Sequence, residues 1–448
     1  MSKIAPLSGF PELLPQQRVV EQQVIDTLRH VFELHGFAGI ETRAVEPLDQ
    51  LLRKGDTSKE VYLLRRLHEE SEEGHAGVGL HFDLTVPFAR YVLENAGKLD
   101  FPFRRYQIQK AWRGERPQEG RFREFTQADI DIVGRDTLAF HHDVEVTRVM
   151  VDALTRLDFL PAFRLQVNNR KLIQGFYAGL GVEDTDEVMR LVDKLDKLAV
   201  EKVRELLLEE AGVPGQVADR VLELATIRAD DDSFVDAVRA LGVEHPLLDE
   251  GLAELSALVR GCADLVSDRV RVTADLSIAR GLDYYTGTVF ETRLDGYESM
   301  GSICSGGRYD ALATDGRTTY PGVGISLGVS RVVVPLLART GLSASRSVPS
   351  AVLVSVADED ARATSTGVAA ALRARDIPCE VAPDAARFGK QIRYAERRGI
   401  PFVWFVQADG THQVKDIRSG EQVAADPAAW TPPTEDLRPQ VVSKENHQ

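Results

Sequence analysis

The chain has 448 residues, of which 43% are hydrophobic and 27% are charged, an ordinary composition for globular domains. At about 100–200 residues per domain, this length predicts two to four domains, each large enough to bury a core. Asp and Glu outnumber Lys and Arg by 69 to 54, and the resulting net charge of −15 argues against a protein that coats nucleic acid non-specifically. A local basic face that grips one RNA is compatible with this balance.

No apolar run approaches the roughly 20 residues that a membrane-spanning helix requires, and the longest, around Val332–Ala338, is interrupted by Pro335. The opening residues, MSKIAP, lack the apolar stretch of a signal peptide. The cysteines Cys262, Cys304 and Cys379 are far apart and form no Cys-x-x-Cys pair, so neither a disulfide framework nor a structural zinc site is supported. We therefore expect a protein of the reducing cytoplasm.

In chain order, residues 17–35 predict an amphipathic helix, because apolar residues recur there at helical spacing. A stretch rich in strand patterns follows over residues 40–134, and residues 137–157 return to a helical pattern. Between residues 184 and 264 apolar residues again follow the helical period, while Lys and Glu fill the other faces. We therefore expect a helical insertion there, with strands resuming at Arg271.

The C-terminal quarter has a different texture. Residues 339–350 are small and polar, which is typical of a linker. Short apolar strands then alternate with helical patterns over residues 351–426, as expected of a small separate α/β domain. Residues 427–448 combine several prolines with few large apolar side chains, and they predict a disordered tail.

The segment from Arg104 to Gly134 carries the most chemistry. Two extended runs flank a loop at residues 116–121 that contains Pro and Gly, which predicts an antiparallel hairpin. Alternation places an aromatic ring, an amide and two carboxylates on one face of the second strand: Phe125, Gln127, Asp129 and Asp131. Six arginines crowd the hairpin: Arg104, Arg105, Arg113, Arg116, Arg121 and Arg123. A solvated face would explain the alternation alone, but guanidinium forks suit phosphate oxygens, which favours a polyanion site.

Two further segments carry polar groups at suggestive spacing. In residues 80–85 alternation predicts a strand with His81, Asp83 and Thr85 on one face, where an ammonium group would find acceptors. An ordinary half-exposed strand explains this pattern equally well. In residues 279–287 two tyrosines lie between glycines, which suits polar rings presented to a cavity, although a tight turn with aromatic packing is slightly favoured.

Glycine and basic residues mark three more places. Paired glycines in residues 305–310 and 322–331 would let a ligand approach the backbone, and neither segment fits a Walker loop or a dinucleotide fingerprint. Near the C-terminus Lys390, Arg393 and Arg397 share one face of an expected helix, with aromatic residues interleaved. A solvated basic face is the simpler interpretation, while such surfaces also suit single-stranded RNA loops.

Together these segments resemble the histidyl branch of the class II aminoacyl-tRNA synthetases, over nearly the whole chain and in order. Residues 41–47 (ETRAVEP), 104–134 and 322–331 resemble motifs 1, 2 and 3 of the class. Residues 280–287 (RGLDYYTG) and 305–310 (SGGRYD) resemble two segments peculiar to the histidyl branch. The last two, preceded by a motif 2 hairpin, make the resemblance highly specific.

The resemblance implies an α+β catalytic domain built on an antiparallel sheet, formed by residues 1–183 and 265–338. Residues 184–264 would be a helical insertion that leans over the tRNA acceptor arm, and residues 351–426 would be an α/β anticodon-binding domain. Motif 1 would form a homodimer. The activity implied is the ATP-dependent joining of histidine to tRNA(His) through a histidyl-adenylate, with Mg²⁺ accompanying ATP and no metal site built from the protein alone.

The resemblance also implies roles for individual residues. ATP would be bound by Arg113, Glu115, Arg121, Phe125 and Arg331. Histidine would be bound by Asp83, Thr85, Gln127, Asp131, Arg280, Tyr284 and Tyr285. Of these, Asp131 and Tyr285 would recognise the imidazole, while Arg280 and Arg113 would be the catalytic groups. The tRNA would be contacted by Arg116, Gln118, Lys390, Arg393 and Arg397.

Two other functions fit parts of this pattern. A catalytically inactive paralogue that senses histidine and regulates ATP phosphoribosyltransferase would resemble the catalytic domain. Such regulators typically lack the anticodon-binding domain and lose reactive arginines, whereas this chain retains Arg113, Arg280 and Arg331. A sister synthetase for glycine, threonine or proline would not need both Asp131 and Tyr285. These comparisons favour the histidine enzyme.

Overall fold

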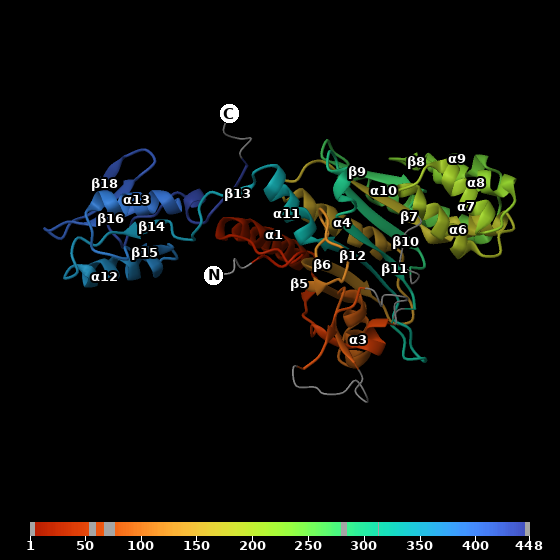
Figure 1. Ribbon diagram of the computed structural model, residues 1–448, viewed down its shortest axis with the longest axis horizontal. Coiled ribbons are helices and arrows are strands. Elements are labelled where there is room, and N and C mark those ends of the chain that lie inside the picture. The colour runs from red at the N-terminus through yellow and green to blue at the C-terminus, as the bar shows by residue number, and fades with distance from the viewer. Residues whose placement is uncertain (1–4, 53–59, 67–76, 279–284, 312, 444–448) are drawn as a thin grey trace. The chain divides into compact units, whose positions relative to one another are not determined.

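The computed structural model describes residues 5–52, 60–66, 77–278, 285–311 and 313–443 (Figure 1). The chain divides into two compact units. The first contains residues 1–11 and 24–334, and the second contains residues 12–23 and 335–448. No helix within the described ranges is long and apolar enough to span a membrane.

The first unit is built on a large sheet with the strand order β1-β5-β6-β12-β11-β10-β7-β9-β8. In that order the strands are Ala38–Gly39, Phe103–Trp112, Glu124–Val133, Gly322–Gly328, Cys304–Tyr309, Thr288–Leu294, Phe163–Asn169, Val270–Asp275 and Arg228–Ala229. The β1–β5 and β7–β9 pairs are parallel, and the other neighbouring pairs are antiparallel. The α+β class built on an antiparallel sheet is confirmed.

One face of this sheet is apolar and covered by helices. On β6 the side chains of Ala128, Ile130 and Ile132 are fully buried, as the alternation predicts. Helix α4 (His141–Thr155) packs against β6 and β12, and α10 (Pro246–Gly261) packs against α5 (Arg170–Gly179), β7 and β9. The polar residues of β6 project to the opposite face, which is therefore the face available for a site.

A small three-stranded sheet, β2-β4-β3, also belongs to the first unit. Its strands are Val45–Pro47, Val78–Leu80 and Leu63–Leu64, with helices α2 (Leu48–Leu51) and α3 (Thr85–Asn95) nearby. The prediction of a strand over residues 80–85 is wrong beyond Leu80, because the side chain of Asp83 accepts a hydrogen bond from the backbone N–H of Val86 at 3.1 Å. This local bond starts a helix where alternation alone predicted extended backbone.

The region between β7 and β9 has the helical character predicted for residues 184–264, with β8 as a short exception. Its elements are α6 (Thr185–Val192), η2 (Asp193–Asp196), α7 (Val200–Glu209), α8 (Gly215–Ala225), α9 (Phe234–Ala240), α10 and η3 (Ala263–Leu265). Helices α6, α7 and α8 each bury one apolar face, with Val188, Val203 and Val221 fully buried, and α7 packs on both α6 and α8, whereas α10 packs on the large sheet.

The second unit contains a five-stranded sheet with the order β15-β14-β16-β17-β18. The strands are Cys379–Val381, Val352–Val354, Phe402–Val406, His412–Asp416 and Gln422–Ala424, with helices α12 (Arg362–Arg373) and α13 (Phe388–Arg398). Strand β14 lies parallel to both of its neighbours, and the fully buried indole of Trp404 belongs to the core. The α/β pattern predicted for this stretch is present.

The remaining elements include α1 (Pro15–Leu34), η4 (Glu298–Met300), α11 (Val329–Arg339) and the two-stranded sheet of β13 (Ser343–Ala344) with β19 (Val441–Val442). The prediction of disorder from residue 427 onward is therefore wrong as far as residue 443. The tail also carries a 3₁₀ turn, η5 (Thr434–Asp436). Trp430 packs edge-on against Phe402, with ring centroids 5.3 Å apart. One aromatic anchor and a strand pairing thus order a segment whose composition indicated no core.

Candidate active site

The predicted hairpin is the centre of the site. Strands β5 and β6 pair antiparallel from Phe103 opposite Val133 to Trp112 opposite Glu124, so the hairpin prediction is confirmed. The connection between them holds most of the predicted arginines. Strand β12 lies on the other side of β6 and brings the glycine-rich segment beside it.

A first pocket, here called the arginine pocket, opens at the end of this hairpin. Five residues of the hairpin that were predicted for ATP or histidine line it: Arg113, Glu115, Arg121, Phe125 and Gln127. Arg331, at the start of α11, closes one side, and Ser302 and Ile303 precede β11 at the edge. The arginine pocket thus gathers residues from positions 113 to 331 of the chain.

Hydrogen bonds hold these side chains in place. The Nε of Arg113 donates to the carbonyl of Phe82 at 3.0 Å, and its guanidinium lies 5.1 Å from the centroid of the Phe125 ring. One nitrogen of Arg121 lies 3.3 Å from a carboxylate oxygen of Glu115. The pocket therefore presents an aromatic ring, a carboxylate and fixed guanidinium groups to a ligand.

Arg331 shows how strongly positive this pocket is. Its guanidinium donates to the carbonyl oxygens of Gly120 at 2.9 Å and Ser302 at 2.6 Å. Burial, together with the positive charges of Arg121 and Arg113, lowers the pKa of Arg331 to about 10. Like charges held this close favour a polyanion in the pocket, because its binding would relieve their repulsion.

A second pocket, here called the carboxylate pocket, adjoins the first. It is lined by Thr85, Asp129, Asp131, Tyr285, Ser305, Gly306, Gly307, Tyr309, Gly324, Ile325 and Ser326. Ser305 and Ser326, which face each other in the pairing of β11 and β12, line both pockets. The two pockets therefore form one continuous site in two chemically different parts.

The carboxylates of this second pocket are deeply buried and partnered. Asp131 accepts a hydrogen bond from the hydroxyl of Tyr309 at 2.8 Å and forms an ion pair with the fully buried Arg105 at 2.7 Å. Asp129 accepts a hydrogen bond from the amide of Gln127 at 3.0 Å, and burial raises the pKa of Asp129. Fixed acceptors in a dry pocket suit a ligand that offers N–H donors.

Two glycines make room for these groups. A Cβ atom at Gly324 would lie 2.1 Å from a carboxylate oxygen of Asp131, and one at Gly307 would lie 2.9 Å from the ring of Tyr285. Any larger residue would displace the polar group beside it. The groups that approach these glycines in the structure are the protein's own, and the predicted approach of a ligand to the paired glycines stays a prediction.

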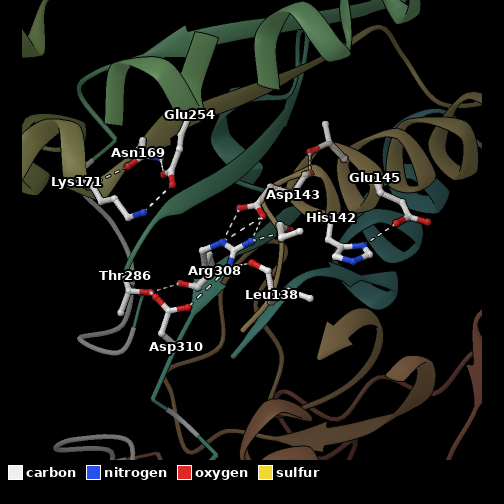
Figure 2. A network of polar contacts seen from close by, with 12 residues as sticks. Leu138, His142, Asp143, Glu145, Asn169, Lys171, Glu254, Thr286, Arg308 and Asp310 are labelled. Carbon is white, nitrogen blue, oxygen red and sulfur yellow. Dashed lines mark hydrogen bonds and ion pairs between the residues drawn. The ribbon is translucent and has the colours of Figure 1, made fainter. Parts of the chain in front are cut away.

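Behind the carboxylate pocket, Arg308 forms a buried network that Figure 2 shows. Its guanidinium donates to both carboxylate oxygens of Asp143 on α4, at 2.5–3.2 Å, and to the carbonyl of Leu138 at 3.0 Å. Its own carbonyl accepts from the backbone N–H of Thr286 at 2.8 Å. Because Thr286 follows Tyr285 directly, this network fixes the backbone that carries Tyr285 into the pocket.

The other predicted residues lie in several places. Asp83 is buried at the start of α3 and does not line either pocket, although its charge contributes to the raised pKa of Asp129. Arg116 and Gln118 lie in the hairpin connection, and Gln118 exchanges backbone hydrogen bonds with Arg121. Lys390, Arg393 and Arg397 lie on α13 of the second unit. Arg280 and Tyr284 lie outside the described residues.

Sequence reasoning counted Arg105 among the arginines of a polyanion site, whereas the structure pairs it with Asp131. It gave no individual role to four residues that lie in or behind the pockets: Ser305, Arg308, Tyr309 and Ser326. A signal existed for the ion pair of Arg105, since the hairpin register places this arginine directly opposite Asp131. No comparable signal exists for Arg308, because its partner Asp143 lies 165 positions away.

Comparison with known proteins adds independent evidence. Residues 9–332 match the protein family described as histidyl-tRNA synthetase, and residues 350–429 match the family described as anticodon binding domain. The histidine–tRNA ligases of Cutibacterium acnes and Micrococcus luteus are each 59% identical to this chain. The alignments cover 99% and 98% of this chain, respectively, and 99% of each relative.

Solved structures give the same picture. The crystal structure of histidyl-tRNA synthetase from a species of Nostoc is 34% identical, with a TM-score of 0.83 over 95% of this chain and 97% of that chain. A structure from Bacillus halodurans, described as an ATP phosphoribosyltransferase regulatory subunit/histidyl-tRNA synthetase, is 20% identical with a TM-score of 0.69. It covers 84% of this chain and 92% of that chain, and it shares the fold.

Proposed function

The chain belongs to the histidyl-tRNA synthetase family, and from this premise we propose that its two adjoining pockets activate histidine with ATP for transfer to tRNA(His). It is an aminoacyl-tRNA synthetase that joins histidine to tRNA. One observation carries the assignment of the site: a pocket ringed by guanidinium groups adjoins a pocket of buried acceptors through Ser305 and Ser326. A nucleoside triphosphate suits the first, and an amino acid with an ammonium group and an imidazole suits the second.

In the arginine pocket, Arg113, Arg121 and Arg331 would hold the phosphates of ATP, since fixed guanidinium forks match phosphate oxygens. Phe125 would stack on the adenine, and Glu115 would accept a hydrogen bond from the adenine amino group. Magnesium would enter with ATP and be held mainly by phosphate oxygens, as this ion prefers. Within the described ranges, no three His, Cys, Asp or Glu side chains gather to hold an ion.

In the carboxylate pocket, Asp131 and Tyr285 would recognise the imidazole of histidine. Tyr284, outside the described residues, is also proposed to bind histidine. Asp131 is suited to this role because Tyr309 and Arg105 hold its carboxylate in one orientation. The α-amino group would be held by Thr85 of this pocket and Gln127 of the adjoining one, while Asp83, which lines neither pocket, would act through its nearby negative charge. A site built to pair both imidazole nitrogens leaves buried polar atoms unpaired with other amino acids, which can give discrimination of about 10⁴–10⁵.

The chemistry follows from this arrangement. A carboxylate oxygen of histidine attacks the α-phosphorus of ATP, the bond to the bridging oxygen breaks, and pyrophosphate leaves. Negative charge concentrates on the α-phosphate, and Arg113 and Arg280 would stabilise it by fixed positive charge. A ribose hydroxyl at the 3′ end of the tRNA then attacks the acyl carbonyl, and AMP leaves. No covalent enzyme intermediate is required.

Contacts with the tRNA would come from two regions. Arg116 and Gln118 of the hairpin connection would meet the acceptor end, and Lys390, Arg393 and Arg397 on α13 would meet the anticodon loop. We also propose a homodimer formed through residues 41–47 and a cytoplasmic location, in keeping with the family's role in translation.

The first test is amino-acid-dependent ATP–pyrophosphate exchange by the purified protein, across all twenty amino acids and without tRNA. We expect exchange with histidine alone. Exchange with a different amino acid would contradict the assignment of Asp131 and Tyr285. Histidine binding without any exchange would instead support a regulatory paralogue that has lost the activation chemistry.

A second prediction concerns α13. Replacing Lys390, Arg393 and Arg397 together by alanine should raise the KM for tRNA about tenfold, because three phosphate or base contacts are lost. Histidine-dependent exchange should stay unchanged, since no tRNA takes part in it. Both are measured on the same preparation, and unchanged tRNA kinetics would show that this helix face is merely solvated.

A further inference from the structure

Three arginines lie side by side across three adjacent strands, beyond the two pockets. The strand register pairs Arg293 of β10 with Arg164 of β7, and it pairs Arg164 with Arg271 of β9. Residues paired in register project to the same face of a sheet. We call Arg293, Arg164 and Arg271 the arginine row.

This row lies on the same face as the active site. Two residues along each strand, a parallel row runs through Ser326, Ser305, Glu291 and Gln166. Its first two members line both pockets of the site, and its last two line a cavity together with Arg164 and Arg293. Since neighbouring strands lie about 4.8 Å apart, Gln166 is about 10 Å from Ser305. The cavity therefore opens next to the site.

The far wall of this cavity comes from the helical region. Asp196 of η2, Val200 of α7 and Thr226 after α8 line it opposite the sheet. The arrangement leaves a space between the sheet and the helices at the side of the active site, lined by charged and polar groups. Such a space suits a polar chain that must pass over the sheet on its way to the pockets.

Within the described part of the chain, the buried atoms of this cavity that lack a hydrogen-bond partner include the Nε of Arg164 and the Oε1 of Gln166. Arg164 and the exposed Arg271 form no ion pair with any carboxylate in the part of the chain that the structure describes, whereas Arg293 pairs with Asp196 at 2.8 Å. Buried polar groups normally have hydrogen-bond partners, so the Nε of Arg164 and the Oε1 of Gln166 point to a ligand or to ordered water. Four carboxylates also line the cavity, and Arg228 and Arg293 pair with three of them: Asp275, Asp196 and Glu291. The guanidinium groups of Arg164 and Arg271 are not engaged in these pairs, which favours an anionic ligand.

We propose that the arginine row holds phosphates of the 3′ end of the tRNA while its terminal ribose reaches the histidyl-adenylate. This inference rests on the proposed function, because only that function brings a nucleic acid strand to the site. The adenylate fills both pockets, so the approaching strand must lie beyond them on the same face. The row supplies the groups that contact a phosphodiester backbone without selecting its sequence, and Gln166 supplies an acceptor for a base.

The test separates the two half-reactions. Arg164→Gln and Arg271→Gln are combined, which removes two positive charges at little cost in side-chain length. Arg260→Gln is the matched control: Arg260 is 71% exposed on α10, and α10 packs against the opposite face of the sheet. For each protein, histidine-dependent ATP–pyrophosphate exchange and single-turnover transfer from enzyme-bound histidyl-adenylate to tRNA are measured, the latter at several KCl concentrations.

We expect the double variant to keep exchange within about twofold and to lose about tenfold or more in the rate of transfer at sub-saturating tRNA. The slope of log affinity against log salt should become shallower by about 1.4, because each lost single-strand phosphate contact contributes about 0.7. The Arg260→Gln control should match the unmodified protein in both assays.

Two results would overturn the proposal. Transfer at the unmodified rate, with an unchanged salt slope, would show that no phosphate lies on the row. A parallel fall in exchange and transfer would show that the row supports the pockets rather than the tRNA. Absence of histidine-dependent exchange in the unmodified protein is a separate outcome, since it would contradict the proposed function itself.

Discussion

The two pockets of the active site adjoin, yet one holds an excess of positive charge and the other holds carboxylates that already have partners. In the arginine pocket three guanidinium groups surround a single carboxylate, that of Glu115, and burial with mutual repulsion lowers the pKa of Arg331 to about 10. In the carboxylate pocket the carboxylates are already partnered, because the fully buried Arg105 lies 2.7 Å from Asp131 and 3.9 Å from Asp129. The first pocket is incomplete without an anion, whereas the second is complete as a set of fixed acceptors.

This difference matches what each pocket has to do. A polyanion brings its own charge, so the protein must hold unbalanced positive charge until the ligand arrives. A neutral imidazole brings none, and its recognition depends on orientation, which buried ion pairs and hydrogen bonds provide. Substitutions should therefore act differently in the two pockets: loss of charge in the first, and loss of geometry in the second.

The largest effect should come from Arg113→Ala. Removing one fixed positive group from the transferring phosphate typically costs about 10²–10³ in rate. We expect histidine-dependent exchange to fall by about that factor, with histidine affinity, measured by calorimetry, unchanged. Near-normal exchange would show that Arg113 holds Phe82 and Phe125 in place without acting on the phosphates.

The hairpin, and with it much of the arginine pocket, could be predicted from sequence. Its residues are contiguous, alternation decides which side chains share a face, and six arginines within one hairpin have few structural explanations. The same rule failed at residues 80–85. There the bond from the Val86 N–H to the Asp83 carboxylate starts a helix, and such a local bond overrides a three-residue alternation.

The supports behind the pockets could not be predicted from sequence, because they depend on distant pairing. Arg308 meets Asp143 across 165 positions, and the arginine row exists only because β10 and β9 flank β7. Nothing near Arg164 in the chain marks it as a neighbour of Arg271. Periodicity indicates the face of a strand, while the order of strands decides which faces meet.

The next largest effect is expected for Arg308, and it tests whether geometry governs the carboxylate pocket. Arg308→Met leaves Asp143 buried without its cation, and breaking such a pair costs about 3–5 kcal/mol of stability. Histidine KM should rise about tenfold, because the Arg308 carbonyl that accepts from the Thr286 N–H keeps its bond but loses the side-chain contacts with Asp143 and Leu138 that fix its position beside Tyr285. The KM for ATP should not change, since ATP is assigned to the arginine pocket and Arg308 lies behind the carboxylate pocket. Thermal unfolding and exchange kinetics measure the two effects.

A double variant separates positioning from stability. Arg308→Met with Asp143→Leu removes both charges, and replacing a buried ion pair by apolar side chains of similar size is often neutral for stability. We expect its melting temperature to recover while histidine KM stays raised, because the hydrogen bond to the Leu138 carbonyl is still missing. If the melting temperature and the histidine KM both returned to the values of the unmodified protein, the Arg308–Asp143 pair would have a purely structural role.

The smallest predicted effect is that of Tyr285→Phe, which removes one hydroxyl and keeps the ring that packs on Gly307. Losing one neutral hydrogen bond to a substrate costs about 1 kcal/mol, or about fivefold in kcat/KM for histidine. ATP KM and melting temperature should be unchanged. Tyr320→Phe is the matched control, because that ring is buried in a core cluster outside both pockets. An equal effect in both variants would remove Tyr285 from histidine recognition and leave the imidazole to Asp131.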